Sequence, residues 1–97
     1  MGRRKRIRPE RLGEKLRSIR NYLDCSLADM AQRLSTDEFS LRRTDISKYE
    51  LDTNEPPLPV LLRYARIVGI TMEILVDDEL DLPESFLTGE KSEKIKR

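Results

Sequence analysis

The sequence predicts a small all-α domain composed of five short helices, and two observations support this fold class. Apolar residues recur at spacings of three and four, which places them on one face of a helix, and no segment shows the sustained alternation of a strand. Residues that typically begin or end helices stand between these segments. The chain has 97 residues, which is enough for one domain with a modest core and too few for two.

The first two predicted helices cover residues 10–23 and 27–34. Pro9 suits the first turn of a helix, and four apolar residues on one face follow it: Leu12, Leu16, Ile19 and Leu23. Ser26 is a suitable N-cap for the second helix, since Asp29 stands three residues later in the position of a capping box.

Three further helices are predicted after a polar connection over residues 35–41. Gly69 is a suitable left-handed end for the fourth helix, and Thr71 is a suitable cap for the fifth. These three helices cover residues 43–51, 59–68 and 72–76. The predicted core is drawn from the first four helices and consists of Leu16, Ile19, Met30, Leu34, Ile46, Leu61, Ala65 and Val68.

Charge is distributed unevenly along the chain, although the formal net charge is only +1. Residues 1–20 hold nine Lys or Arg and two Glu, whereas residues 49–97 hold six basic and eleven acidic residues. The pattern divides the chain into a basic N-terminal arm over residues 1–9, a helical domain over residues 10–76 and an acidic, then mixed-charge, extension over residues 77–97. The density of the arm favours contact with an anionic partner such as nucleic acid.

Composition argues against an enzyme and against a membrane protein. The chain has no histidine and one cysteine, Cys25, so a Ser-His or Cys-His nucleophile pair is impossible and a conventional zinc site nearly so. No apolar run approaches the roughly 18 residues of a membrane helix, and no apolar stretch of a secretory signal follows the basic N-terminus. We therefore expect a cytoplasmic protein that is not an enzyme and has neither cofactor nor metal.

Three segments together carry a family resemblance: Ser26-Leu-Ala-Asp-Met-Ala-Gln-Arg-Leu34, Thr44-Asp-Ile-Ser-Lys-Tyr-Glu50, and Pro57 followed by Leu61-Leu-Arg-Tyr-Ala-Arg-Ile-Val-Gly-Ile-Thr71. In this order and spacing they resemble the lambda-repressor/Cro-like helix-turn-helix family, also called the XRE family, over roughly residues 10–76. The resemblance implies a compact five-helix DNA-binding domain. The second and third helices would form the helix-turn-helix, and the third would lie in the major groove of DNA.

The resemblance also implies which residues contact DNA. Arg42 matches a position at the start of the third helix that caps it and touches phosphate, and Ser47 faces partly outward toward the DNA backbone. Arg43 and Thr44 match the first base-reading positions and Lys48 a later one; the Arg43 guanidinium suits guanine O6 and N7. The complete set of predicted DNA-contacting residues is Ser26, Arg42, Arg43, Thr44, Ser47 and Lys48, with Arg3, Arg4, Lys5 and Arg6 of the arm. Arg20 and Glu50 match an ion pair between the first and third helices.

The sequence departs from the family in three places. Leu27 stands where the family has a DNA-contacting glutamine, the turn before the third helix is about five residues longer than usual, and its glycine is missing. The lengthened turn also carries Asp37 and Glu38, whose charges would repel phosphate. The family's basic loop after the third helix is replaced here by residues 52–55, which are net negative.

Two functions are consistent with these residues. The first is sequence-specific binding of double-stranded DNA by a bacterial transcriptional regulator, with homodimerisation left open. The second is a protein-interaction module, antitoxin- or anti-repressor-like, in which the scaffold has lost DNA readout. Residues 77–87 mix acidic and apolar side chains, so they are either a frayed end or a strip that docks on a partner or on the domain itself.

Overall fold

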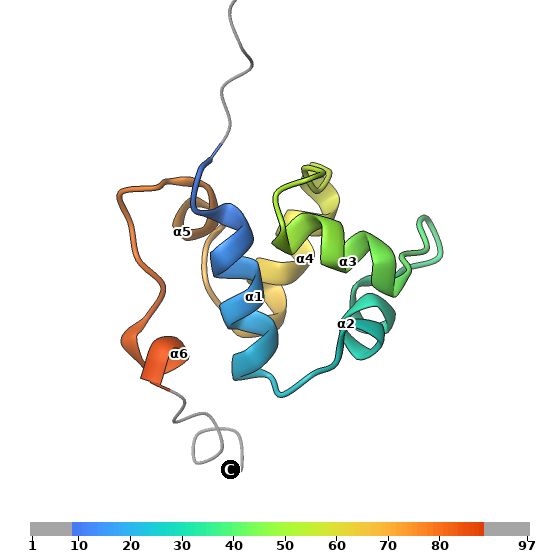
Figure 1. Cartoon of the computed structure of the whole chain (residues 1–97), viewed down its shortest axis with the longest axis horizontal. Coiled ribbons are helices and arrows are strands. Elements are labelled where there is room, and N and C mark those ends of the chain that lie inside the picture. Colours follow the sequence, from blue (N-terminus) through green and yellow to red (C-terminus); the bar gives the residue numbers. More distant parts are fainter. Residues whose placement is uncertain (1–8, 89–97) are drawn as a thin grey trace, which may run out of the picture.

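Six α-helices form the part of the chain that the computed structural model describes, residues 9–88, and this part contains no strand. The all-α prediction is confirmed, and the five predicted helices are present with boundaries within two residues of those expected. The sixth helix, at the end of the described chain, was not predicted. In order, the helices are α1 (Leu12–Tyr22), α2 (Leu27–Leu34), α3 (Arg43–Glu50), α4 (Leu58–Val68), α5 (Met72–Val76) and α6 (Glu84–Thr88) (Figure 1).

Local capping accounts for several of these boundaries. The Ser26 Oγ accepts a hydrogen bond from the Asp29 N–H (3.0 Å), and the Asp29 carboxylate accepts one from the Ser26 N–H (3.2 Å), which confirms the predicted capping box of α2. Gly69 ends α4 in the left-handed region with φ of 74°, as expected. The prediction for Thr71 is only half right: it is the N-cap of α5, but its side chain makes no capping hydrogen bond.

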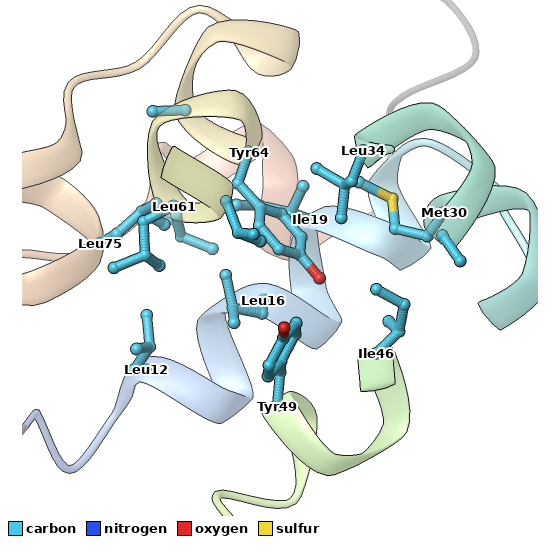
Figure 2. Close-up of a cluster of buried hydrophobic side chains, with 14 of the residues drawn as sticks. Leu12, Leu16, Ile19, Met30, Leu34, Ile46, Tyr49, Leu61, Tyr64 and Leu75 are labelled. Atoms are coloured by element: carbon cyan, nitrogen blue, oxygen red, sulfur yellow. The ribbon is translucent and has the colours of Figure 1, made fainter. Parts of the chain in front are cut away.

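The helices surround one apolar core, with α1 at its centre between α5 and α6 on one side and α2 and α3 on the other (Figure 1). Figure 2 shows side chains from α1 to α5 meeting there, including Leu16, Ile46 and Tyr64. Seven of the eight predicted core residues are buried. The exception is Val68, which is only half-buried because it is the last residue of α4, beside the exposed Gly69. Buried residues outside that prediction include Lys15, Val60, Tyr64, Leu75, Leu82 and Phe86.

Residues 77–87, here called the C-terminal strap, dock on their own domain. Leu82 and Phe86 are buried in the common core, and the Phe86 ring stacks on Tyr22 of α1 with ring centroids 4.1 Å apart. Of the possibilities that the sequence left open, the structure therefore shows docking on the domain itself. The strap covers one side of α1 and holds α6 there.

Hydrogen bonds from the strap also fix where α1 begins. The Asp78 carboxylate accepts hydrogen bonds from the backbone N–H groups of Glu10 (2.8 Å) and Arg11 (3.0 Å). These two residues were predicted to lie in the helix, but α1 begins after them, at Leu12. Asp78 thus acts as a remote cap for N–H groups that precede α1, and these bonds lower the pKa of its carboxyl group.

Two basic side chains, from the N-cap residue Arg11 and from Lys15 of α1, complete the attachment of α1 to the strap and α5. The Arg11 guanidinium donates to the Asp78 carbonyl (2.7 Å) and pairs with the Asp81 carboxylate (2.8 Å). Lys15 is 2% exposed, and its ammonium group donates to the carbonyls of Ile74 (2.8 Å) and Asp77 (2.9 Å) at the end of α5. Because the ammonium group is desolvated, the pKa of Lys15 is lowered. The buried charge is tolerated because carbonyl oxygens accept its hydrogen bonds.

Candidate nucleic-acid interface

The third helix has one anchored side and one exposed side. Ile46 is fully buried and Tyr49 is 6% exposed, so these two side chains attach α3 to the core (Figure 2). Burial also raises the pKa of the Tyr49 hydroxyl, which stays protonated at neutral pH. The predicted contact residues face the other way: Arg42, Arg43, Thr44 and Lys48 are exposed, and Ser47 is half-buried. The structure therefore brings these five side chains together at the outer surface of α3.

The start of α3 is organised around Arg42 and Asp45. Arg42 is the N-cap residue, as predicted from the family position, but its own side chain does not cap the helix. The Asp45 carboxylate instead accepts a hydrogen bond from the Arg42 N–H (2.8 Å) and lies 3.8 Å from the Arg42 Nε. The Arg42 side chain is 79% exposed, so its guanidinium group extends into solvent, where an anion can reach it.

Ser26 lies at the start of α2 and has a structural task there. Its hydroxyl oxygen accepts the capping bond from Asp29, yet the residue is exposed and its hydroxyl hydrogen can still donate. Leu27, the next residue, is half-buried against the core and has no polar group to offer. The second helix thus presents a hydroxyl group, but no glutamine, at its N-terminal end.

The long connection between α2 and α3 is an ordered turn that projects from the molecule (Figure 1). Thr36 and Phe39 exchange backbone hydrogen bonds of 2.8 and 3.3 Å across the turn. The Ser35 hydroxyl group donates to the Ala31 carbonyl (2.8 Å) and accepts from the Leu41 N–H (2.8 Å), which ties the turn to the end of α2. The exposed acidic pair Asp37 and Glu38 stands at its tip. A serine hydroxyl thus helps to organise a turn that lacks the family's glycine.

Two exposed polar residues next to this turn were missed by the sequence predictions. Gln32 of α2 and Ser40 of the turn line an open hollow that also includes Arg42 and Arg43. Both carry hydrogen-bond donors suited to phosphate oxygens. The signal available in the sequence was the position of Gln32, which lies on the face of α2 opposite Met30 and Leu34. Ser40 carried no signal, because it lies outside any regular element.

The position of α3 against α1 is fixed by two contacts. Arg20 and Glu50 form the predicted ion pair, with Nε to Oε2 at 2.7 Å and Nη2 to Oε1 at 3.0 Å. The hydrogen bonds to Glu50 raise the pKa of the Arg20 guanidinium above its already high value. Gly13 allows a close approach, since a Cβ atom there would lie 2.6 Å from the Glu50 carbonyl oxygen. Any larger residue would push the end of α3 away from α1.

The charge on this side of the molecule is nearly balanced among the described residues. Arg42, Arg43 and Lys48 are exposed on α3, whereas the exposed carboxylates of Asp37, Glu38 and Asp52 flank it. Asp52 follows α3 with a left-handed backbone (φ 61°). The acidic loop predicted to replace the family's basic loop is therefore a surface feature.

The remaining predictions concern the N-terminal arm, a metal site and a membrane span. Arg3, Arg4, Lys5 and Arg6 belong to residues 1–8, which the structure does not describe. Between residues 9 and 88, no group of three or more His, Cys, Asp or Glu side chains is arranged to hold a metal ion. None of the helices in this range is long and apolar enough to span a membrane.

Comparison with known proteins identifies the domain. No curated protein matches the chain. The sequence does match a family described as helix-turn-helix domain over residues 13–79, more than half of its length. The matched region runs from α1 through α5 and ends before the buried Leu82 and Phe86 of the strap. With α2, the ordered turn and α3 in place, the chain belongs to the helix-turn-helix domain family, a family of DNA-binding domains.

Proposed function

We propose that this protein is a transcriptional regulator of the XRE type that binds double-stranded DNA sequence-specifically, with α3 in the major groove. The observation that carries the proposal is the division of α3 into two sides. Ile46 and Tyr49 anchor one side, while Arg42, Arg43, Thr44 and Lys48 lie together on the other. The major groove is about 12 Å wide and admits a helix presented in this way.

Each exposed residue has a role suited to its chemistry. Arg43 and Lys48 bond guanine O6 and N7, and Thr44 contacts a base edge through its hydroxyl or methyl group. Arg42 at the start of the helix, with Ser47 and Ser26, contacts phosphate oxygens and sets the register of the protein on the duplex. Arg3, Arg4, Lys5 and Arg6 add phosphate contacts, which supply non-specific affinity in place of the acidic loop after α3.

A salt series tests the proposal. Binding of the full chain to mixed-sequence duplex DNA is measured by fluorescence anisotropy at several salt concentrations, followed by selection of a preferred site from a random library. We expect log affinity to fall linearly with log salt concentration, by about 0.9 for each neutralised phosphate. We also expect a preferred site to emerge. A chain that shows no salt-dependent binding to duplex DNA of any sequence would refute the proposal.

The exposed carboxylates around α3 favour one alternative, a protein-interaction module. Asp37 and Glu38 at the tip of the turn and Asp52 after α3 would oppose the approach of phosphates and would instead suit a basic protein surface. The salt series separates the two functions, because the module would bind no duplex. The C-terminal strap is a weaker candidate for the partner site, since Leu82 and Phe86 are already buried against α1.

A further inference from the structure

Two adjoining hollows lie where α1, α4 and α5 meet the loop that follows α3. The larger is an open apolar groove lined mainly by Pro9, Leu12, Pro56, Leu58, Leu61 and Val76. The smaller shares Pro9, Leu12, Glu55 and Pro56 with it and is completed by Asp52 and Asn54. The two hollows therefore share one wall. Leu58, Leu61 and Val76 line only the larger hollow, and Asp52 and Asn54 line only the smaller one.

The groove has a buried floor and a strongly exposed rim. Leu12 and Leu61 are 3% and 4% exposed, so the floor belongs to the core. Leu58 is 69% and Val76 38% exposed, and both line the groove above that floor. An apolar surface of this kind gains free energy when an apolar side chain covers it. No residue of the C-terminal strap lines the groove, and the Phe86 ring of the strap lies against Tyr22 at the other end of α1.

The acidic side is held close to the start of α1. The Asp52 carboxylate oxygens lie 2.8 Å from the position that a Gly13 Cβ atom would take. Glu55 lines both hollows and is half-buried. Guanidinium groups are suited to such a pair of carboxylates.

The chain itself supplies a segment that matches both hollows. Pro9 lines both of them, so the residues that precede it reach the described domain at the shared wall. The preceding sequence is Arg6-Ile7-Arg8, in which a basic, an apolar and a basic residue alternate. A residue before proline favours an extended backbone, and successive side chains of an extended backbone point to opposite sides. Ile7 would then face one hollow while Arg6 and Arg8 face the other.

We propose that residues 6–8 dock on this surface, with Ile7 in the apolar groove and the guanidinium groups of Arg6 and Arg8 beside Asp52 and Glu55. Docking holds the root of the arm next to the loop that follows α3. It also places positive charge beside that acidic loop. Of the four arm residues proposed to contact phosphate, Arg6 then takes this role instead, and Arg3, Arg4 and Lys5 remain for phosphate. The benefit to DNA binding rests on the proposed function, but docking is measured without DNA, so the two can fail separately.

Paramagnetic relaxation in solution tests the docking. A nitroxide is attached at Lys5→Cys in a Cys25→Ser background, and the methyl signals of the full chain are recorded by NMR without DNA. We expect the label to remove most of the intensity of the Leu58 and Val76 methyl signals and to leave Leu34, on the far side of the core, unaffected. Ile7→Ser, and separately Asp52→Asn with Glu55→Gln, should restore the lost intensity. Leu87→Ser, which removes an exposed leucine outside the groove, should not restore it.

Three results would overturn the proposal. The first is an unchanged intensity of the Leu58 and Val76 signals, and the second is a loss that is spread evenly over the domain. The third is a loss of methyl intensity that persists both in Ile7→Ser and in the variant with Asp52→Asn and Glu55→Gln. A mixed sample identifies the chain that supplies the arm. In this sample, one population of chains carries the nitroxide but no isotope, and the other carries the isotope but no nitroxide. A loss of intensity in that mixture would show that the groove belongs to an interface between two copies and would refute docking within one chain.

Discussion

Arg20 and Glu50 form a two-pronged ion pair that joins α1 to the last residue of α3, with Nε–Oε2 at 2.7 Å and Nη2–Oε1 at 3.0 Å. The Arg20 side chain is 16% exposed and the Glu50 side chain 6%. Arg20 also donates to the Cys25 carbonyl in the connection between α1 and α2. One guanidinium group therefore links α1, α3 and the chain segment that leads into α2.

Glu50→Ala should lower the free energy of unfolding by about 3–5 kcal/mol, because it leaves the largely buried Arg20 charge without its partner. Chemical denaturation followed by circular dichroism measures the change. Glu14→Ala is the matched control, since Glu14 lies on the exposed face of α1 and, among residues 9–88, pairs only with a partly exposed Arg11 at 3.4 Å. A melting temperature of Glu50→Ala equal to that of the unmodified chain would contradict the prediction.

Tyr64→Phe should stabilise the protein by about 1 kcal/mol, because it removes a polar group that is buried without compensation. Tyr64 is fully buried, and its hydroxyl group has no hydrogen-bond partner within the described chain. Burial also raises the pKa of this phenol far above its usual value, so the hydroxyl group keeps its proton at neutral pH. Thermal unfolding of Tyr64→Phe and of the control Tyr49→Phe gives the comparison. A loss of stability in Tyr64→Phe alone would mean that the hydroxyl group has a stabilising partner.

Phe86→Ala should cost about 3 kcal/mol of stability, although Phe86 lies beyond the region matched by the family. Its ring is buried and stacks on Tyr22, so the substitution removes a large apolar group from the core. The neighbouring Leu87 is 59% exposed, and Leu87→Ala should change stability by no more than about 0.5 kcal/mol. Urea unfolding of both variants measures the difference. Equal free energies of unfolding for the two variants would show that the Phe86 ring adds nothing to the stability of the fold.

Asp78→Asn should destabilise the protein at neutral pH and have progressively less effect in acid. The folded pKa of Asp78 lies below its ordinary value of 3.8, because backbone N–H groups of Glu10 and Arg11 bond to the carboxylate. Its stabilising contribution is therefore complete above about pH 3.8 and is lost as the pH falls through the lowered folded pKa. Urea unfolding of both proteins from pH 7 down to pH 3 measures this, with the exposed Glu79→Gln as control. If the stability difference between Asp78→Asn and the unmodified chain stayed constant with pH, the ionised Asp78 carboxylate would not be the stabilising group.

Arg43→Ala and deletion of residues 1–8 should weaken DNA binding in different ways. Arg43→Ala should cost about 1–3 kcal/mol on the preferred site and relax the preference at one base pair. The deletion should weaken binding to all sequences alike and flatten the slope of log affinity against log salt concentration. Affinities over a salt series, on preferred and scrambled duplexes, distinguish the two. Equal losses on both duplexes for Arg43→Ala would remove it from the base-reading residues.

Local sequence information predicted most of the fold. The periodic apolar residues of α1 to α4, the Ser26–Asp29 capping box and the Gly69 helix end all depend on neighbours within a few positions along the chain. Such signals can be read directly, because each is a relation between residues of one helix. The contact residues on α3 came instead from the family resemblance, and the burial of Ile46 and Tyr49 on the opposite side of the helix leaves most of them exposed.

The long-range contacts could not be predicted from the residues alone. The carbonyls that hold the Lys15 ammonium group lie 59 and 62 positions away in the chain. The Asp78 carboxylate that fixes the start of α1 lies 68 and 67 positions from Glu10 and Arg11. Nothing in the local pattern distinguishes this lysine from a surface lysine, or this aspartate from its acidic neighbours. The same holds for Phe86, whose sequence surroundings resemble those of a frayed end.

The sequence by itself thus determined five helices, the Ser26 cap of α2, the Gly69 end of α4 and the buried side of the first four helices, because helix formation and amphipathicity are local properties. The Arg20–Glu50 pair came from the family resemblance, and the structure confirmed it. Only the tertiary structure decided that the strap closes the core, that Asp78 ends the irregular segment before α1, and that a groove remains beside Pro9. These features depend on which surfaces meet after the helices pack, and that is set by the balance of burial and hydrogen bonding over the whole chain.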